Sequence, residues 1–181
     1  MKKLCEYQEK YLDVETSTHI FNVTKIALII GREMKLNEDS LLTLHEAAHF
    51  HDIGKIKIPP GIIDKCGPLT KEEYEIVKTH SKFGYDILIE FGATKEVAEC
   101  VLYHHERCDG SGYPNGLVKD EIPVLSKIVA VADVFEALKN VRPYKKAWSE
   151  EKIYYYFVND KTLCDQAKDI LLSNFKELFL L

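Results

Sequence analysis

The sequence has few of the features that mark secreted, membrane-spanning or disulfide-bonded proteins. Its five cysteines are odd in number and form no CxxC pair, which favours reduced thiols over a disulfide framework or a structural zinc site. The two lysines near the start are not followed by an apolar stretch, so this segment is no signal peptide. The longest apolar run on an early helix, IALII at 26–30, is far too short to span a bilayer. We therefore expect a cytoplasmic protein that does not cross a membrane.

A basic surface is also missing. The 24 Lys and Arg residues against 29 Asp and Glu leave a formal net charge of −5, which argues against a nucleic-acid or membrane-surface binder. An acidic chain can still take an anionic substrate where metals, Lys or Arg supply local positive charge. Because the 181 residues contain no repeat, low-complexity tract or linker, we expect residues 1–181 to form a single domain.

Nearly every long segment has the apolar spacing of a helix, and nothing suggests a sheet, although short β pieces could lie in Lys55–Ile58. We therefore expect an all-α fold of about seven helices. A capping box at 70–73 and the capping residues Thr94 and Ser149 predict three helix starts, and Pro123 predicts a fourth as a first helical residue. The predicted helices cover about 15–34, 39–51, 70–90, 94–104 and 123–139, with two more after 149.

The stretch HEAAHFHDIGK at 45–55 contains two overlapping metal motifs. HEAAH matches the HExxH pattern of zinc peptidases, with His45 and His49 one helical turn apart, whereas His51 and Asp52 match the adjacent pair of a metal phosphohydrolase. A zinc peptidase would need a third ligand beyond the HExxH helix, and the remaining histidines complete a larger set. We therefore interpret HEAAH as a coincidence, with its histidines packing in the fold or hydrogen-bonding to a ligand carboxylate.

Histidines and carboxylates recur along the chain in a pattern that suits metal binding. Glu15 and His19 are four residues apart, so they face one side of the first long helix. Neighbouring residues on a helix point about 100° apart, so an adjacent pair at a helix end can serve two metals more easily than one. The full set lacks thiolate, which suits iron, manganese or another first-row metal better than structural zinc. It comprises Glu15, His19, His51, Asp52, His80, His104, His105 and Asp133.

Asp133 is the most informative member of this set. It lies in the apolar run IVAVADVF, on a helix that we expect to be buried. An unpaired buried carboxylate costs several kcal/mol, so this group must be protonated, paired with a cation or bound to a metal. A salt bridge to Lys127 or Arg142 is the alternative to a metal, and the number of histidines in the set favours the metal.

Five stretches of the sequence resemble the HD-GYP family of the HD phosphohydrolase superfamily. The resemblance covers a motif-bearing core of about 15–147 and fades in the C-terminal helices at about 150–181. It implies a single all-helical HD-type domain with two or three divalent metals, Fe or Mn, in the bundle. It also implies metal-dependent hydrolysis of cyclic di-GMP to linear pGpG or on to GMP. The stretches are HDIGK (51–55), KCGPLTKEE (65–73), HHERCDGSGYP (104–114), VADVFEAL (131–138) and RPYKKA (142–147).

The resemblance further implies a role for each residue that matches a family motif. It makes the eight histidines and carboxylates metal ligands, with Asp52 as the catalytic bridging carboxylate and Glu15 as a ligand in members that hold a third metal. It places Lys55 near the scissile phosphate, where positive charge would stabilise the transition state. The GYP loop and the basic residues after it would bind the substrate; they are Gly112, Tyr113, Pro114, Arg142 and Lys145.

The loop at 107–117 is rich in glycine. Gly110, Gly112 and Gly116 would let it adopt positive φ and bring its backbone close to a ligand. Tyr113, in the middle of this loop, either stacks on or hydrogen-bonds to the substrate, or merely packs against the protein.

Three other functions stay open at this point. The chain could act on another cyclic dinucleotide or a nucleotide as an HD phosphohydrolase, or hold a di-iron centre that activates oxygen, although an oxygenase would not need Lys55, Arg142 and Lys145. It could also be a non-catalytic cyclic di-GMP receptor, although a receptor has no need for eight metal ligands. A homodimer and a separate regulatory protein are the further partners we consider, because no sensory domain precedes the module in this chain.

Overall fold

The computed structural model describes residues 2–9, 14–140 and 147–181, except the side chains of residues 2, 9, 14 and 15. In this part of the chain it contains eleven α-helices and one 3₁₀ helix, η1, and no β-strand. Asp109 and Val118 form an isolated antiparallel bridge. The elements are α1 (Lys2–Glu9), α2 (Val14–Glu33), α3 (Glu38–Phe50), η1 (Ile53–Lys57), α4 (Pro60–Ile63), α5 (Lys71–Lys78), α6 (His80–Glu90), α7 (Lys95–Tyr103), α8 (Val124–Lys139), α9 (Glu150–Asn159), α10 (Asp165–Ser173) and α11 (Phe175–Phe179).

The predicted all-α fold is confirmed, and most predicted helix starts agree with the structure. The Thr70 side chain accepts a hydrogen bond from the backbone N–H of Glu73, whose carboxylate accepts one from the Thr70 backbone, so the capping box is formed. Thr94 and Ser149 likewise cap α7 and α9 through their side chains. Pro123 precedes α8 as its N-cap and is not its first residue.

The helix predicted over 70–90 is wrong in one respect, because it divides at Thr79 into α5 and α6. The Thr79 hydroxyl donates to the carbonyl of Ile76 at 2.6 Å, and the ring of His80 donates to the carbonyl of Val77 at 2.7 Å. Side chains therefore satisfy carbonyls that the next helical turn would otherwise use. The break turns His80 from a residue late in one long helix into the first residue of α6.

The last predicted helix also divides, at Asn174, between α10 and α11. The Asn174 side-chain amide donates to the carbonyl of Ile170 at 2.9 Å, which ends the helix in the same way. The β pieces considered for Lys55–Ile58 are replaced by η1, and the short helices α1 and α4 carry no pattern that predicted them. The two divisions, together with α1 and α4, account for the difference between the seven α-helices predicted and the eleven found among the described residues.

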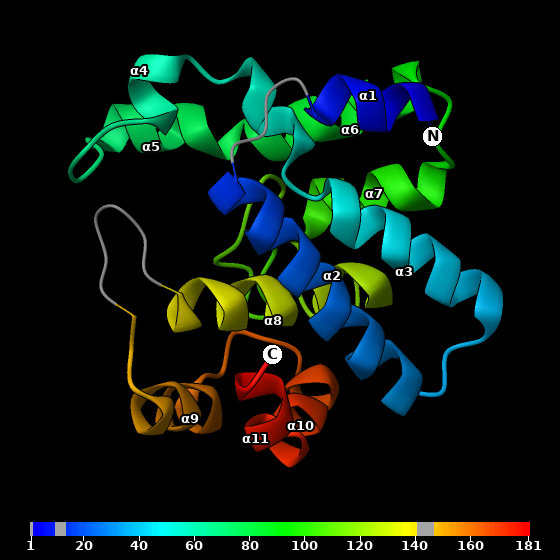
Figure 1. Ribbon diagram of the computed structural model, residues 1–181, viewed down its shortest axis with the longest axis vertical. Coiled ribbons are helices and arrows are strands. Elements are labelled where there is room, and N and C mark those ends of the chain that lie inside the picture. The colour runs from blue at the N-terminus through cyan, green and yellow to red at the C-terminus, as the bar shows by residue number, and fades with distance from the viewer. Residues whose placement is uncertain (1, 10–13, 141–146) are drawn as a thin grey trace.

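The helices are arranged around α2 and α8, which cross the middle of the molecule (Figure 1). α2 buries Ile20, Val23, Ala27 and Ile30, the residues whose spacing predicted this helix. α8 is buried over most of its length. α3 and α7 pack beside them, α1 and α4–α6 form a layer at one end, and α9–α11 cover the other end (Figure 1). This packing brings the C-terminal ends of α3, α5 and α7 close to the side of α8.

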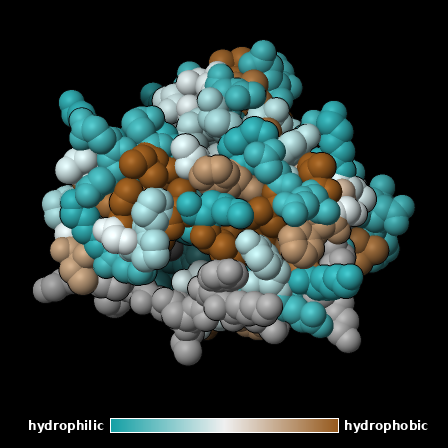
Figure 2. Space-filling view, turned by 90° about the horizontal axis from the view of Figure 1, so that it is seen from above, coloured by the Kyte–Doolittle hydropathy of each residue, from teal (hydrophilic) through white to brown (hydrophobic). Residues whose placement is uncertain are grey.

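The layer of α1 and α4–α6 shows hydrophobic residues interrupted by hydrophilic ones (Figure 2). Exposed apolar side chains on α5 and α6 include Ile76, Phe83 and Ile89. No helix in the described ranges combines the length and the apolar character that a membrane crossing needs.

Gly54 holds η1 against α6 and so positions the residues on either side of it. A Cβ atom at this position would lie 1.9 Å from the backbone oxygen of His80 and 2.5 Å from the backbone nitrogen of Gly84. Both atoms belong to the backbone, so neither can rotate away. The HDIGK motif therefore needs glycine here for close approach of two backbones.

We predict that Gly54→Ala lowers the free energy of unfolding by about 1–3 kcal/mol or more, because the added methyl forces η1 away from α6. Urea denaturation of the purified chain would measure the change. Gly61→Ala is the matched control, since a Cβ there meets nothing within 4 Å and lies in α4. Equal stability of Gly54→Ala and Gly61→Ala would contradict the prediction.

Candidate metal centre

Three histidines stand at helix ends and are oriented by the same hydrogen bond. His51 follows α3, His80 follows the last turn of α5, and His104 follows α7. In each, Nδ1 donates to the carbonyl three residues earlier, at 2.7, 2.7 and 2.6 Å respectively. Because a carbonyl only accepts hydrogen bonds, the proton lies on Nδ1 and the lone pair of Nε2 points away from the helix. The helix ends therefore decide which ring nitrogen can bind a metal.

One group of possible ligands consists of His19, His51 and Asp133, whose ligand atoms all lie within 4.8 Å of one another. The Nε2 atoms of the two histidines are 3.3 Å apart, and Oδ1 of the aspartate lies 3.3 Å from Nε2 of His19. It also lies 4.0 Å from Nε2 of His51. The alternative salt bridge of Asp133 to Lys127 is absent, and Arg142 lies outside the described residues.

A second group consists of His80, His104 and His105, again with ligand atoms within 4.8 Å of one another. The Nε2 atoms of His80 and His104 are 3.5 Å apart, and the rings of the adjacent pair have centroids 4.0 Å apart. The sequence predicted that this pair would contribute to a cluster. The structure brings His104 and His105 together with His80, the first residue of α6, which lies more than twenty positions earlier in the chain.

Asp52 lies between the two groups. Its Oδ1 is 3.5 Å from Nε2 of His80, whereas its Oδ2 is 3.4 Å from Nε2 of His51 and 3.7 Å from Nε2 of His19. Lys55 also contacts Oδ2, with its Nζ at 2.5 Å. Each carboxylate oxygen therefore faces a different group, which is the arrangement that a bridging ligand requires.

The donors fit bound metal ions by their own chemistry. The Nε2 atoms of His80 and His104 both carry lone pairs and face each other at 3.5 Å with no proton to share between them. Both side chains are buried, and Asp52 retains only 4% of its side-chain exposure. Converging lone pairs in a buried site repel one another unless a cation lies among them. Imidazole and carboxylate donors without thiolate suit first-row metals such as iron and manganese.

The electrostatics of the site keep His80, His104, His105 and Asp52 in the forms that can bind a metal. Burial, reinforced by the electrostatic effect of the neighbouring His51 and His80, lowers the pKa of His104 to about 3. Burial is also the main cause that lowers the pKa of His80 and of His105. Burial alone would raise the pKa of Asp52, but Lys55 and His51 outweigh it and hold that pKa well below its usual range.

Glu136 is a site residue that the sequence analysis missed. It is buried and accepts a hydrogen bond from Nδ1 of His19, as well as one from the side chain of Asn140 at 2.6 Å. This contact leaves Nε2 of His19 to face Asp133, and the two carboxylates raise the pKa of His19 to about 9 against the effect of burial. The available signal was its position three residues after Asp133, which places both acids on one face of α8.

Glu106 is a second buried acid that the sequence analysis did not assign. Its two carboxylate oxygens accept hydrogen bonds from the backbone N–H groups of Asn115 at 2.7 Å and Leu117 at 2.9 Å. The residue follows the His104-His105 pair directly, so it ties the far side of the GYP loop to the metal ligands. The signal was its place in HHE, where a charged residue stands between two histidines and a glycine-rich loop.

The glycines of the GYP loop act in two different ways. Gly110 and Gly116 have φ values of 79° and 67°, so the predicted positive φ is confirmed at both. Gly112 has no positive φ; instead, a Cβ there would lie 2.4 Å from the backbone of Glu106 and Arg107. The prediction for Gly112 was therefore wrong about the angle, and the residue is needed for close backbone approach.

Tyr113 packs against the metal centre. Its ring is stacked on that of His105, with centroids 4.6 Å apart and an angle of 30° between the planes, and its backbone N–H donates to the carbonyl of His105 at 3.2 Å. Pro114, the next residue, is exposed. The GYP loop thus covers one side of the second histidine group.

The structure also decides between the two overlapping motifs. The rings of His45 and His49 stack on each other with centroids 6.2 Å apart, and neither joins the two donor groups found among the described residues. His49 packs against Phe50, as expected, but His45 is exposed and not packed in the fold. Three other predicted site residues cannot be placed. The side chain of Glu15 and the whole of Arg142 and Lys145 lie outside the described part of the structure.

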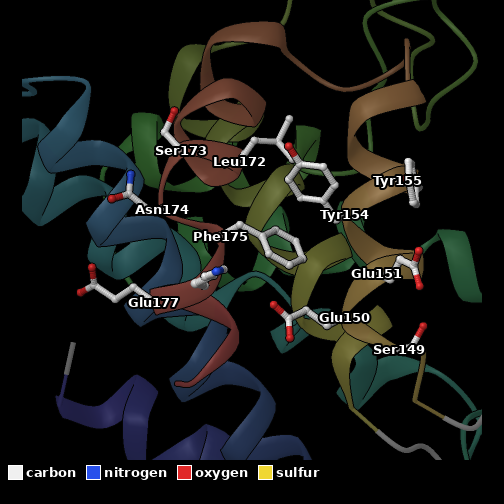
Figure 3. Close-up of a pocket in the computed structure, with 11 residues that line it drawn as sticks. Ser149, Glu150, Glu151, Tyr154, Tyr155, Leu172, Ser173, Asn174, Phe175 and Glu177 are labelled. Atoms are coloured by element: carbon white, nitrogen blue, oxygen red, sulfur yellow. The ribbon is translucent and has the colours of Figure 1, made fainter.

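A cavity of about 860 Å³ lies elsewhere, between α9 and α11 (Figure 3). The rings of Tyr154 and Phe175 meet at its wall, with centroids 5.3 Å apart, and Glu150 and Glu177 stand at its edge. None of the predicted metal or substrate residues lines it. The cavity is therefore separate from the two donor groups.

The fold and the donors together define a class of protein, an all-helical domain in which buried histidines and aspartates converge from several helix ends. An HD domain family model matches residues 2–153, and the chain belongs to the HD domain family. The HD-GYP resemblance is confirmed by relatives such as RpfG of Xanthomonas campestris, a cyclic di-GMP phosphodiesterase response regulator. RpfG is 38% identical over 178 residues, which cover 93% of this chain and 46% of RpfG.

Two further relatives match a shorter part of the chain. A cyclic di-GMP phosphodiesterase of Thermotoga maritima is 46% identical over 138 residues, 75% of this chain and 38% of that protein. The 3'3'-cGAMP-specific phosphodiesterase 2 of Vibrio cholerae is 38% identical over 144 residues, 77% of this chain and 27% of that protein. The chain therefore spans less than half the length of these relatives.

Solved structures share the fold. Bd1817, an HDG"Y"P protein of Bdellovibrio bacteriovorus, superposes with a TM-score of 0.71 at 19% identity, covering 88% of this chain and 52% of that chain. The HD domain of the L. monocytogenes phosphodiesterase PgpH superposes with a TM-score of 0.61 at 18% identity, covering 91% and 93%. At these identities the likeness establishes the all-helical HD architecture.

We predict that the metal-free protein loses stability as the pH falls below about 6.5, the ordinary pKa of histidine in the unfolded chain. The folded-state pKa of His104 lies at about 3. As the pH falls, His104 is therefore protonated in the unfolded chain before it is protonated in the folded one, and the unfolded state is favoured. The expected slope for this residue is about 1.4 kcal/mol per pH unit. His19 acts in the opposite direction, since its pKa of about 9 makes its contribution present below 6.5 and lost as the pH rises toward 9.

Urea denaturation at pH 7, 6 and 5 after removal of metals would measure this slope. His104→Gln is uncharged in both states, so it should unfold with a shallower pH dependence whatever its absolute stability. Parallel pH profiles for wild type and His104→Gln would contradict the assignment of a neutral, buried imidazole.

Proposed function

We propose that the chain is a metal-dependent phosphodiesterase that hydrolyses cyclic di-GMP to linear pGpG, and further to GMP. The observation that carries the proposal is the pair of facing Nε2 lone pairs on His80 and His104, with Asp52 reaching from this group to the other. Cations would relieve the repulsion between these lone pairs, and bound cations would in turn attract an anionic substrate. The names of the relatives, two of them cyclic di-GMP phosphodiesterases, supply the substrate.

Two metal ions would be held by the two donor groups, with Asp52 contributing to both. A third ion would require Glu15 as an additional ligand. We propose iron or manganese, because the donors are imidazoles and carboxylates. When bound, such ions lower the pKa of a water molecule and neutralise negative charge on the attacked phosphate. His19, His51, Asp52, His80 and His104 are buried, whereas Asp133 and His105 are partly exposed, so a substrate can reach the centre from their side.

The remaining residues of the chain would orient the ligands and the substrate. Lys55 places its ammonium next to Asp52, where it would add positive charge beside the attacked phosphate. Glu136 holds His19 in one tautomer, and Glu106 holds the GYP loop over the second donor group. Tyr113 stacks on a histidine of that group and would help to hold its ring in place. Arg142 and Lys145 are proposed to hold the other phosphate, on the family resemblance alone.

A second substrate deserves testing, because relatives of similar identity in Vibrio cholerae are named 3'3'-cGAMP-specific phosphodiesterases. Cyclic di-GMP and 3'3'-cGAMP differ in one base and share both phosphates. The metal centre acts on the shared part, so it does not distinguish them. Discrimination has to come from residues that contact the bases.

The first experiment is anaerobic incubation of the purified chain with cyclic di-GMP and Fe(II) or Mn(II), with the products separated by chromatography. We predict linear pGpG, and GMP at longer times, with 3'3'-cGAMP tested in parallel. Asp52→Ala should lower turnover at least a hundredfold, because it removes the oxygen atoms that face both donor groups. His45→Ala should leave turnover unchanged, because His45 is exposed and outside both groups.

Absence of turnover in protein shown to contain metal would overturn the phosphodiesterase proposal. Tight binding of cyclic di-GMP without turnover would then favour a receptor, and oxygen consumption by the iron-loaded protein would favour an oxygenase. Loss of activity in His45→Ala together with full activity in Asp52→Ala would favour HExxH chemistry instead.

We predict that Glu136→Gln lowers metal affinity or kcat about 10–100-fold, the usual effect of removing a carboxylate that orients a metal-binding histidine. The glutamine side chain has the size of the glutamate, but its uncharged amide is a weaker hydrogen-bond partner for Nδ1 of His19. It therefore holds Nε2 of His19 less firmly in position to bind a metal. Metal titration and steady-state kinetics would measure the loss. Glu151→Gln, on the exposed side of α9, serves as the charge-matched control. Equal metal affinity together with equal kcat in the two variants would contradict this role for Glu136.

A further inference from the structure

Lys78 is a positively charged residue beside the metal centre that has no role in the chemistry described above. It ends α5, two residues before His80. Its Nζ lies 5.7 Å from the ring centroid of Tyr113, which in turn is stacked on His105. One aromatic ring therefore separates this ammonium group from a histidine of the second donor group.

The position of this ammonium is set by a second aromatic ring. Nζ of Lys78 lies 5.0 Å from the ring centroid of Tyr74, one helical turn earlier on α5, and this tyrosine is 47% exposed. Two rings with negative faces hold the cation at the edge of the site. The Lys78 side chain keeps 27% of its exposure, so a ligand can reach it.

The carboxylate that pairs with Lys78 does not explain its placement. Nζ lies 2.6 Å from Oε1 of Glu75, but the side chain of Glu75 is 67% exposed. An exposed ion pair three residues apart on a helix contributes little to stability. An ammonium group has three N–H donors, so this contact with Glu75 leaves Lys78 able to bind an anion as well.

Other described cations near this edge are already engaged. Arg107, which acts on the pKa of Tyr113, donates to the carbonyls of Glu106 at 2.9 Å and His104 at 3.5 Å. Lys55 is held by Asp52 at 2.5 Å, inside the centre. Lys78, in contrast, is paired with an exposed carboxylate, that of Glu75.

We infer that Lys78, in addition to the residues proposed above for this role, binds the phosphate of a cyclic dinucleotide that is not being hydrolysed, at the edge of the site formed by Tyr74 and Tyr113. This inference rests on the proposed function. A cyclic dinucleotide carries two phosphates, and only one of them can occupy the metal centre. An ammonium is a compact charge with three donors, which suits a phosphate better than a base edge. Lys78 would then act in substrate selection, favouring substrates with a second phosphate over those with one.

The test compares cyclic di-GMP with bis(p-nitrophenyl) phosphate, a phosphodiester that has one phosphate only. We expect Lys78→Met to lower the ratio of kcat/KM for cyclic di-GMP to that for bis(p-nitrophenyl) phosphate at least tenfold, as loss of a charge-assisted hydrogen bond would do. Most of the loss should appear in KM, and Lys78→Arg should restore most of the ratio because it keeps the charge.

Lys82→Met is the matched control. Lys82 also has a carboxylate partner, Asp86 at 2.6 Å, and lies 4.9 Å from an aromatic ring centroid, that of Tyr85, but it stands on the exposed side of α6. Its loss should not change the ratio. A ratio within twofold of wild type in Lys78→Met would overturn the inference. An equal loss for both substrates would also overturn it, because the lysine would then support the metal centre and not the second phosphate.

Calorimetric binding of cyclic di-GMP to the metal-loaded chain separates this inference from the proposed function. Binding without turnover would overturn the proposed function, and Lys78→Met would still have to weaken that binding at least tenfold for the inference to stand. If the wild-type chain does not bind cyclic di-GMP, both are overturned.

Discussion

The site depends on hydrogen bonds from histidine Nδ1 atoms to carbonyls of the preceding helical turn. An α-helix leaves its last carbonyls without partners, and a histidine placed just after the last turn can satisfy one of them. His51, His80 and His104 do so, and each thereby presents Nε2 as its free donor. His19 lies in the middle of α2, where the carbonyls are already used. It relies on Glu136 from α8 instead, so its orientation depends on a contact between two helices.

The same arrangement creates the electrostatic character of the centre. Neutral imidazoles are brought close to one another in a buried place, which is unfavourable in the absence of cations. Burial depresses the pKa of His104 because it penalises the charged form of the ring. The carboxylates of Asp52 and Asp133 stay charged because lysine and histidine partners outweigh the effect of burial. The apolar contacts of α2, α3, α7 and α8 must hold this repulsive set together. Metal affinity and apo-protein stability are therefore opposing consequences of one geometry.

Most of the candidate ligands could be found from the sequence because the signals are local. An adjacent His-Asp or His-His pair at the end of a predicted helix, or an aspartate in an apolar run, is visible without a fold. The choice of HD over HExxH could also be made, since only one of the motifs had enough partners elsewhere in the chain. His45 shows the limit, because a buried-face prediction for a single position depends on which neighbours cover α3, and none covers this residue.

What the sequence by itself determined is the helical fold, the helix caps and the list of donors, because each follows from residues within a few positions of one another. The tertiary structure decided how the donors divide into two groups and that Asp52 faces both, because these relations join helices that are far apart in the chain. It also decided the roles of Glu136, Glu106 and Gly54. A buried acid or a glycine acquires its function from the atom that lies opposite it, and only the packed helices bring that atom there.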